Sequence, residues 1–192
     1  MFCLDLETLG VESTSAILSL GMTYFDASKP ISMRQLFRDS IFIKFDVQDQ
    51  MRKYNRTKER STLDWWSKQC DYAKQTNLLP SDKDVLTADG VHRLREWFLE
   101  RPDAKNEMVW VRGHLDQPVF ESLLRAMGEP PFISYAAFRD VRTAIDCFYP
   151  NSKNGYVEVD LERCPDYNRD QIVKHHPVAD CVLDICQLFA GK

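Results

Sequence analysis

The sequence has no apolar stretch near the roughly 20 residues that a membrane-spanning helix needs. Its apolar start is interrupted almost at once by Asp5 and Glu7, which does not fit a secretory leader. The six cysteines include no C-x-x-C pair, and the histidines are not clustered at zinc-ligand spacing, which argues against a structural zinc site. We therefore expect a cytoplasmic protein with reduced cysteines and no membrane segment.

The chain also lacks an excess of basic residues. It contains 25 lysines and arginines and 29 acidic residues, which gives a net charge of −4. This charge argues against a general nucleic-acid coat protein. The balance still permits an enzyme that holds nucleic acid at one metal site. A hydrophobic content of 44% over 192 residues is typical of a globular chain. With no repeat and no low-complexity tract, we expect one domain over residues 1–192.

Strand patterns fill the first third of the chain, and helical patterns follow. Apolar residues alternate over 18–24 and 41–47, and a short polar link at 10–14 predicts that the first two strands are antiparallel. A compact apolar run at 107–111 predicts a buried strand, and 138–142 predicts another, followed by a helix through Phe148. Helical spacing covers 91–98 and 119–127, with Pro118 and Gly128 at the ends of the second helix, and a last helix follows Pro177. This order predicts an α/β domain with a mixed sheet, and residues 150–172 form a loop near the site.

Two carboxylates lie two positions apart on the first predicted strand. Asp5 and Glu7 would therefore point to the same side of that strand. Like charges on one face repel each other unless a cation lies between them, and carboxylate oxygens suit magnesium or manganese. The alternative is an exposed strand edge.

Three further residues have both a chemical and a structural interpretation. Asp116 follows a predicted strand and begins a helix, so it is either a metal ligand or an N-cap. Asp180 lies opposite the apolar stripe of the last helix, beside Asp184, where periodicity alone predicts exposure to solvent. A ligand at the rim of a cleft would have the same pattern. His175 is either a structural histidine or an acid–base group.

In this order, the segment Asp5-Leu6-Glu7-Thr8, then Asp116, then His175-x-x-x-x-Asp180 resembles the three-motif signature of DEDDh 3′–5′ exonucleases. These belong to the ribonuclease H-like (DnaQ-like) superfamily. The similarity is closest to the phage exonuclease DexA branch, to exodeoxyribonuclease VIII-like domains and to mycobacterial exoribonuclease-like domains. The other matching segments span most of the chain: Ile43-Lys44-Phe45-Asp46, Thr62-Leu63-Asp64-Trp65-Trp66, Arg112-Gly113, Arg139-Asp140-Val141-Arg142-Thr143 and His175 to Cys181.

The resemblance implies a single DEDDh domain with a five-stranded mixed sheet flanked by helices. It implies that four acids hold two magnesium or manganese ions while His175 takes a proton from water: Asp5, Glu7, Asp116 and Asp180. The reaction would release nucleoside 5′-monophosphates from the 3′ end of single-stranded nucleic acid, with DNA favoured. Leu6 and Thr8 would contact the terminal nucleotide. Relatives often have Asn or small residues before the second Asp, whereas this chain has His114-Leu115, which leaves nearby sugar and base contacts undefined.

Weaker signals concern the substrate. A basic tract precedes Trp65 and Trp66, and basic side chains beside aromatic ones suit single strands: Arg52, Lys53, Arg56, Lys58 and Arg60. The alternative is a solvated loop. We expect one of the two tryptophans in the core and the other against substrate. Arg112 either reaches a phosphate or forms a surface ion pair. Asp140 is expected to cap a helix or pair with Arg142 rather than act in catalysis.

Three other functions fit the same residues. One is a 3′–5′ exoribonuclease that processes RNA ends, another is a phosphodiesterase for small molecules, and a third is a non-cleaving nucleic-acid-binding module. The sequence does not distinguish DNA from RNA, or a monomer from a homodimer. The resemblance to phage enzymes implies a phage-encoded protein in a bacterial cytoplasm.

Overall fold

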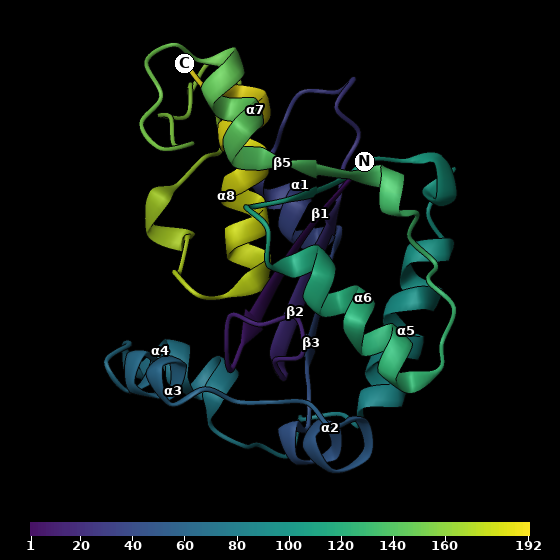
Figure 1. Cartoon of the computed structure of the whole chain (residues 1–192). Helices are drawn as coiled ribbons and strands as arrows, with labels where there is room; N and C mark the ends of the chain where they lie inside the picture. Colours follow the sequence, from purple (N-terminus) through teal and green to yellow (C-terminus); the bar gives the residue numbers. More distant parts are fainter.

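A five-stranded mixed sheet with helices on both faces forms the centre of the molecule, in a computed structural model that describes residues 1–192 (Figure 1). The strand order is β3-β2-β1-β4-β5. β1 pairs antiparallel with β2, and β2 pairs antiparallel with β3, whereas β1–β4 and β4–β5 are parallel. This confirms the predicted α/β class and the antiparallel first strands, and it is the arrangement of a ribonuclease H-like fold. The strands are β1 (Phe2–Thr8), β2 (Ile17–Tyr24), β3 (Ser40–Lys44), β4 (Val109–Val111) and β5 (Phe138–Asp140).

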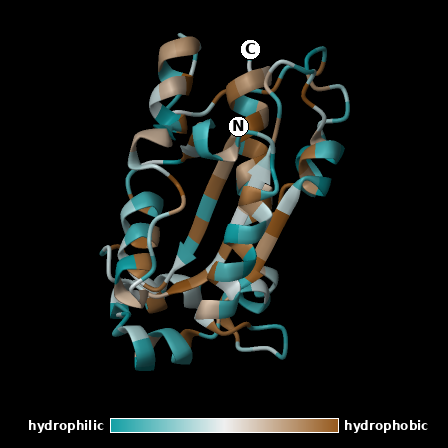
Figure 2. Cartoon of the chain, turned by 90° about the vertical axis from the view of Figure 1, so that its right-hand side faces the viewer, coloured by the Kyte–Doolittle hydropathy of each residue, from teal (hydrophilic) through white to brown (hydrophobic).

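The helices divide between the two faces of the sheet. Apolar residues of α1, α7 and α8 form one buried cluster, and those of α5 and α6 form another on the opposite face. In Figure 2 the hydrophobic colour is concentrated along the central strands and the helix against them, and hydrophilic colour marks the outer helices. The α-helices are α1 (Met33–Arg38), α2 (Val47–Tyr54), α3 (Arg60–Ser67), α4 (Asp71–Ala73), α5 (Thr87–Leu99), α6 (Asp116–Met127), α7 (Val141–Phe148) and α8 (Pro177–Ala190). A π-helix, η1 (Lys74–Leu78), follows α4, and three short 3₁₀ helices span Ala104–Asn106, Tyr135–Ala137 and Arg169–Gln171.

Strand β1 carries apolar side chains on one face and the acid pair on the other. Phe2, Leu4 and Leu6 pack with α5 and α6, and Cys3 packs with α8. Because side chains alternate along a strand, Asp5 and Glu7 lie on the same face as Cys3. The acid pair therefore faces helix α8, which carries Asp180.

A glycine lets α8 approach the sheet next to the acids. Gly21 on β2 is paired with Asp5 of β1. A Cβ atom at Gly21 would lie 2.5 Å from the carbonyl carbon of Pro177 and 2.5 Å from the nitrogen of Val178, both main-chain atoms. Glycine inside a strand often marks such a close approach of another backbone. Gly21 thus sets the distance between Asp5 and the first turn of α8.

Most element boundaries agree with the sequence patterns. Pro118 lies in the first turn of α6, Gly128 ends that helix with a φ of 71°, and Pro177 begins α8. Strand β3 is shorter than predicted, because Asp46 accepts hydrogen bonds from the backbone of Gln48 and Asp49 and so caps α2. No helix combines the length and the apolarity that a membrane crossing requires.

We expect Gly21→Ala to lower the free energy of unfolding by about 1–3 kcal/mol, the usual cost of overpacking. The added methyl group meets main-chain atoms of α8, which cannot rotate away. Urea denaturation followed by circular dichroism measures the change. An unchanged midpoint would contradict this close approach.

Candidate active site

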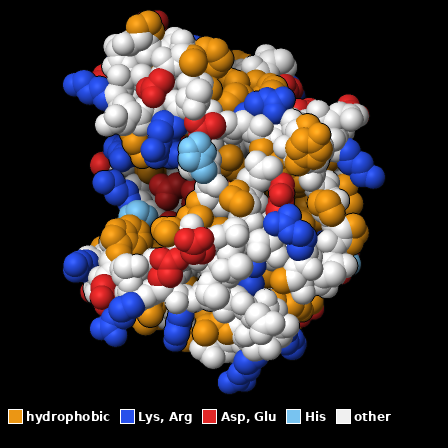
Figure 3. Space-filling view, in the orientation of Figure 1, with side chains coloured by type: hydrophobic (Ala, Val, Ile, Leu, Met, Phe, Trp, Pro, Cys, Tyr) orange, Lys and Arg blue, Asp and Glu red, His pale blue; other side chains and the backbone are white.

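Three of the four predicted acids and the histidine line one pocket. This pocket has a volume of about 640 Å³, within the range of roughly 300–1,000 Å³ that is usual for small-ligand sites. Figure 3 shows a hollow with acidic side chains at its bottom and basic and histidine side chains on its rim. Seven of the predicted site residues line the pocket: Asp5, Leu6, Glu7, Trp65, Arg112, His175 and Asp180. Residues from the start, middle and end of the chain thus meet at one place.

Glu7, His175 and Asp180 form the tightest group in the pocket. Each offers one ligand atom, and these atoms lie within 4.8 Å of one another. His175 Nδ1 is 3.5 Å from Glu7 Oε1. The backbone N–H of His175 donates to Asp180 Oδ2 at 3.0 Å, although α8 begins two residues later. The arrangement can hold a cation or move a proton.

Asp116 reaches the same site from the opposite face of the sheet. It is the first residue of α6, and its side chain makes no capping hydrogen bond, so the N-cap interpretation is wrong. Its Oδ1 instead accepts a hydrogen bond of 3.3 Å from the backbone N–H of Leu6, between Asp5 and Glu7. The carboxylate is 4% exposed and does not line the pocket surface.

Burial and like charge make the acid cluster unfavourable to ionise. Burial, with Asp116 and Glu7 nearby, raises the pKa of Asp5 well above its usual range. Burial also raises the pKa of Asp116 to about 8 and that of Asp180 to about 7. The pKa of His175 is raised chiefly by its contact with Glu7. A bound cation would favour the ionised carboxylates, and their oxygen donors fit magnesium or manganese.

Arg112 is committed to a buried ion pair. Its Nε and Nη2 both lie 2.8 Å from Asp184 Oδ1, and the two side chains are 12% and 6% exposed. Its Nη1 donates to the carbonyl of Gly155, and its guanidinium lies 4.2 Å from the ring centre of Tyr156. Arg112 does form an ion pair, but the pair is buried rather than on the surface, because loop 150–172 covers it. Asp184 also corrects the helical-wheel prediction that this face of the last helix is solvated.

The two tryptophans have different environments. Trp66 is fully buried, and its Nε1 donates to the carbonyl of Thr8 at 3.0 Å. The Thr8 hydroxyl donates to the Gly10 carbonyl, and neither Thr8 nor Trp66 lines the pocket. Trp65 is 42% exposed, and its ring centre lies 4.9 Å from that of His175. The core tryptophan is thus Trp66, and the one at the pocket is Trp65.

Two of the weaker sequence signals are structural. Arg56 is 4% exposed and donates to main-chain carbonyls of Ser13, Ser15 and Val119, so it is a core residue rather than part of a basic surface. Asp140 caps α7 by accepting from the backbone N–H of Thr143, as predicted.

Several residues of the pocket were not predicted from the sequence. Tyr156, Arg169 and Lys174 line it from loop 150–172 and the segment that follows. No periodic pattern marks this irregular segment. Asp184 is the exception, because it is four residues after Asp180 and its spacing therefore predicts a position on the same face of α8.

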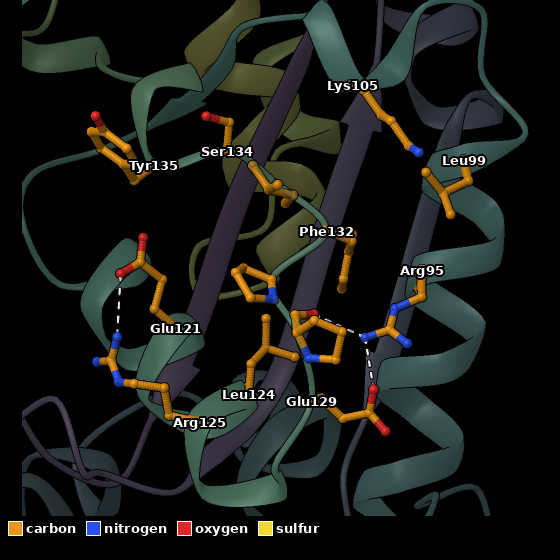
Figure 4. A pocket seen from close by; sticks show the side chains of 13 residues that line it. Arg95, Leu99, Lys105, Glu121, Leu124, Arg125, Glu129, Phe132, Ser134 and Tyr135 are labelled. Carbon is orange, nitrogen blue, oxygen red and sulfur yellow. Dashed lines mark hydrogen bonds and ion pairs between the residues drawn. The ribbon is translucent and has the colours of Figure 1, made fainter.

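A second pocket lies between α5 and α6 and contains none of the predicted site residues. Arg95 and Glu129 form an ion pair across it, and Tyr135 lies at its edge (Figure 4). This second pocket therefore has no part in the predicted site.

Two comparisons with known proteins identify relatives of the whole chain. The family model described as "3'-5' exoribonuclease Rv2179c-like domain" matches residues 1–185. The chain is also similar to an exodeoxyribonuclease of Enterobacteria phage T4, with 28% identity over 206 residues, which covers 97% of this chain and 86% of the relative.

We expect the metal-free protein to lose stability as pH rises from about 5 to about 8. Asp116 and Asp180 have raised pKa values of about 8 and about 7, so the folded state holds protons that the unfolded chain releases near pH 4. The raised pKa of His175 acts in the same direction. Carboxyls with a lowered pKa, such as Asp140 and Asp166, contribute their full stabilisation of the folded state above about pH 4. Their contribution is therefore constant between about pH 5 and about pH 8 and does not oppose this trend.

Urea denaturation in EDTA at pH 5 and pH 8 measures this change. Asp116→Asn should raise metal-free stability at pH 8, because the amide needs no proton. Added magnesium or manganese should stabilise the unsubstituted protein more at pH 8 than at pH 5. Greater metal-free stability at pH 8 than at pH 5 would contradict the account.

Proposed function

Since the chain belongs to the family of 3'-5' exoribonuclease Rv2179c-like domains, and is therefore a 3′–5′ exonuclease that acts on nucleic acid, we propose that it is a DEDDh enzyme that shortens single-stranded DNA. The site and the sheet that carries it would work as one domain over residues 1–192. The observation that carries the DEDDh assignment is the grouping of Glu7, His175 and Asp180 at one pocket.

The family implies dependence on a divalent metal. We assign two magnesium or manganese ions to the four acids of the site: Asp5, Glu7, Asp116 and Asp180. When bound, such ions supply Lewis-acid stabilisation of the charge that develops on the phosphate and leaving oxygens. The buried carboxylates with raised pKa values support this assignment, because no lysine or arginine forms an ion pair with any of the four acids.

His175 is assigned as the general base. Its Nδ1 faces Glu7 Oε1, which leaves Nε2 to accept a proton from the attacking water. The water oxygen bonds to the terminal phosphorus, and the bond from phosphorus to the 3′ oxygen of the preceding nucleotide breaks. The released 3′ oxygen takes up a proton from solvent, so the products are a nucleoside 5′-monophosphate and a shortened strand with a new 3′-hydroxyl group. The contact with Glu7 keeps the imidazole directed into the pocket.

We assign the remaining pocket residues to the substrate strand. Trp65 offers an exposed ring for a base, and Leu6 provides an apolar contact in the same pocket. Arg169 and Lys174 line the pocket, are exposed and have no salt bridge, so they can contact phosphates. Arg112 is assigned to the site through its ion pair with Asp184 and its contact with Tyr156 rather than through a free guanidinium.

DNA is the substrate that we favour. The relative from phage T4 is named an exodeoxyribonuclease and covers nearly the whole chain. RNA is the second candidate, because the matching family is described as exoribonuclease-like. The phage relative also supports our expectation of a phage-encoded enzyme that acts in a bacterial cytoplasm.

A time course on DNA and RNA oligonucleotides of the same sequence, labelled at the 5′ end, tests the proposal. With magnesium or manganese, we expect stepwise shortening from the 3′ end, faster on DNA, and none in EDTA. His175→Ala should lower kcat by about 100- to 10,000-fold, the usual contribution of one general base. The matched control is His92→Ala, an exposed histidine on α5 whose loss should leave the rate unchanged. A full rate in His175→Ala would remove the proton-transfer assignment.

The tryptophan pair supplies a second test. Trp65→Ala should weaken substrate binding by about 1–3 kcal/mol, a rise in KM of about 5- to 150-fold, because one base loses its stacking partner. Its stability should change little, since the ring is partly exposed. Trp66→Ala should instead cost about 3–5 kcal/mol of stability through the cavity it leaves. Steady-state kinetics and urea denaturation of both variants give the comparison, and an unchanged KM in Trp65→Ala would contradict the stacking role.

A further inference from the structure

We propose that Asn77, in the π-helix η1, is a positioning residue that holds the main chain of His175 and thereby directs its imidazole towards Glu7. This inference rests on the proposed role of His175 as general base. Asn77 lies 98 residues from His175 in the sequence, and no motif of the sequence analysis includes it.

The backbone of His175 needs such support. Its φ is 60°, in the left-handed region that residues with a side chain rarely adopt. A residue with a side chain is strained in that region and persists there only where its surroundings fix it. Both main-chain polar groups of His175 are held: its N–H donates to Asp180 Oδ2, and its carbonyl accepts from Asn77 Nδ2. Asn77 therefore fixes the carbonyl group of His175, the strained residue that carries the proposed base.

The Asn77 side chain is itself held on every side. It is 1% exposed. Its Nδ2 also donates to the Ala73 carbonyl at 3.0 Å, and its Oδ1 accepts from the Ser19 hydroxyl at 2.5 Å. The orientation of the amide follows, because two carbonyls can only accept and so must face the nitrogen. Both N–H groups and the oxygen are bonded, which leaves the amide no alternative position.

Ser19 connects this amide to the acid pair. On the antiparallel β1–β2 ladder, Ser19 is the direct partner of Glu7, and both residues lie on the face towards α8. Glu7 Oε1 is in turn 3.5 Å from His175 Nδ1. These contacts connect four residues from four separate segments of the chain: Glu7, Ser19, Asn77 and His175. A shift of Asn77 would move the base relative to the acid that orients it.

The π-helix explains how Asn77 reaches His175. The N–H of Leu79 donates to the Lys74 carbonyl at 2.8 Å, a five-residue step that adds one residue to the turn. Such insertions redirect a side chain and occur often at functional sites. Lys44 anchors the segment independently, since its Nζ bonds the carbonyls of Gln75 and Leu79 and pairs with Asp84 at 3.2 Å. Loss of the Asn77 side chain should therefore leave η1 in place.

Two substitutions separate positioning from simple stability. Asn77→Ala removes all three hydrogen bonds. Asn77→Asp keeps the shape and the acceptor for Ser19 but has no donor for the His175 carbonyl. For both variants we expect kcat to fall by about 10- to 100-fold, the scale of a misplaced catalytic group. We expect KM for a DNA oligonucleotide and the calorimetric affinity for magnesium to stay within about twofold.

The decisive comparison repeats Asn77→Ala in the His175→Ala background. If Asn77 acts through His175, the second substitution should lower kcat there by no more than about twofold. The matched control is Gln50→Ala, because Gln50 is also a fully buried amide but bonds the main chain of Ile17. It should lose stability and keep kcat at a temperature where it is folded.

Three results would overturn the inference. One is an unchanged kcat in folded Asn77→Ala and Asn77→Asp. Another is an equal loss of kcat from Asn77→Ala with and without His175. The third is a full rate in His175→Ala, in which case the proposed role of His175 fails and the inference fails with it. If kcat falls in His175→Ala but not in Asn77→Ala, only the positioning role is contradicted and the proposed function is unaffected.

Discussion

Burial of several carboxylates close together is the constraint on which this molecule depends. The acids of β1 and α8 line one pocket, Asp116 of α6 lies buried behind it, and burial raises the pKa of Asp5, Asp116 and Asp180. The chain supplies few countercharges, because Arg112 is already paired with Asp184 and His175 contacts Glu7. A fold selected for stability alone would avoid such a site. Its presence is understandable as a stability cost that divalent cations offset.

The rest of the architecture holds this unfavourable site in place. The sheet buries apolar side chains on both faces, and this packing supports a strained residue and a charged pocket at one end. Gly21 lets α8 lie directly on β2, and Asp116 reaches between the acids of β1 from the other face. The left-handed conformation of His175 is held from two sides, by Asp180 and Asn77. Packing of the rigid elements thus fixes the positions of the side chains that line the pocket.

Local patterns predicted the features that depend on local physics. Alternation predicted the first strands, Pro118 and Gly128 marked the ends of α6, and Pro177 marked the start of α8. The prediction for the face of α8 failed because loop 150–172, which has no period of its own, covers the side that carries Asp184. The Arg112–Asp184 pair and the Asn77–His175 bond join residues 72 and 98 positions apart. Only the folded chain brings such residues together.

The central claim is that the folded, metal-free site holds protons that divalent cations displace. Titration calorimetry of magnesium or manganese near pH 7, in buffers with different ionisation enthalpies, measures this directly. The account predicts net release of protons on binding, because the pKa values of Asp116 and Asp180 lie at about 8 and about 7 without metal. It also predicts a smaller release in Asp116→Asn. Binding without proton release, or no binding of either ion, would contradict it.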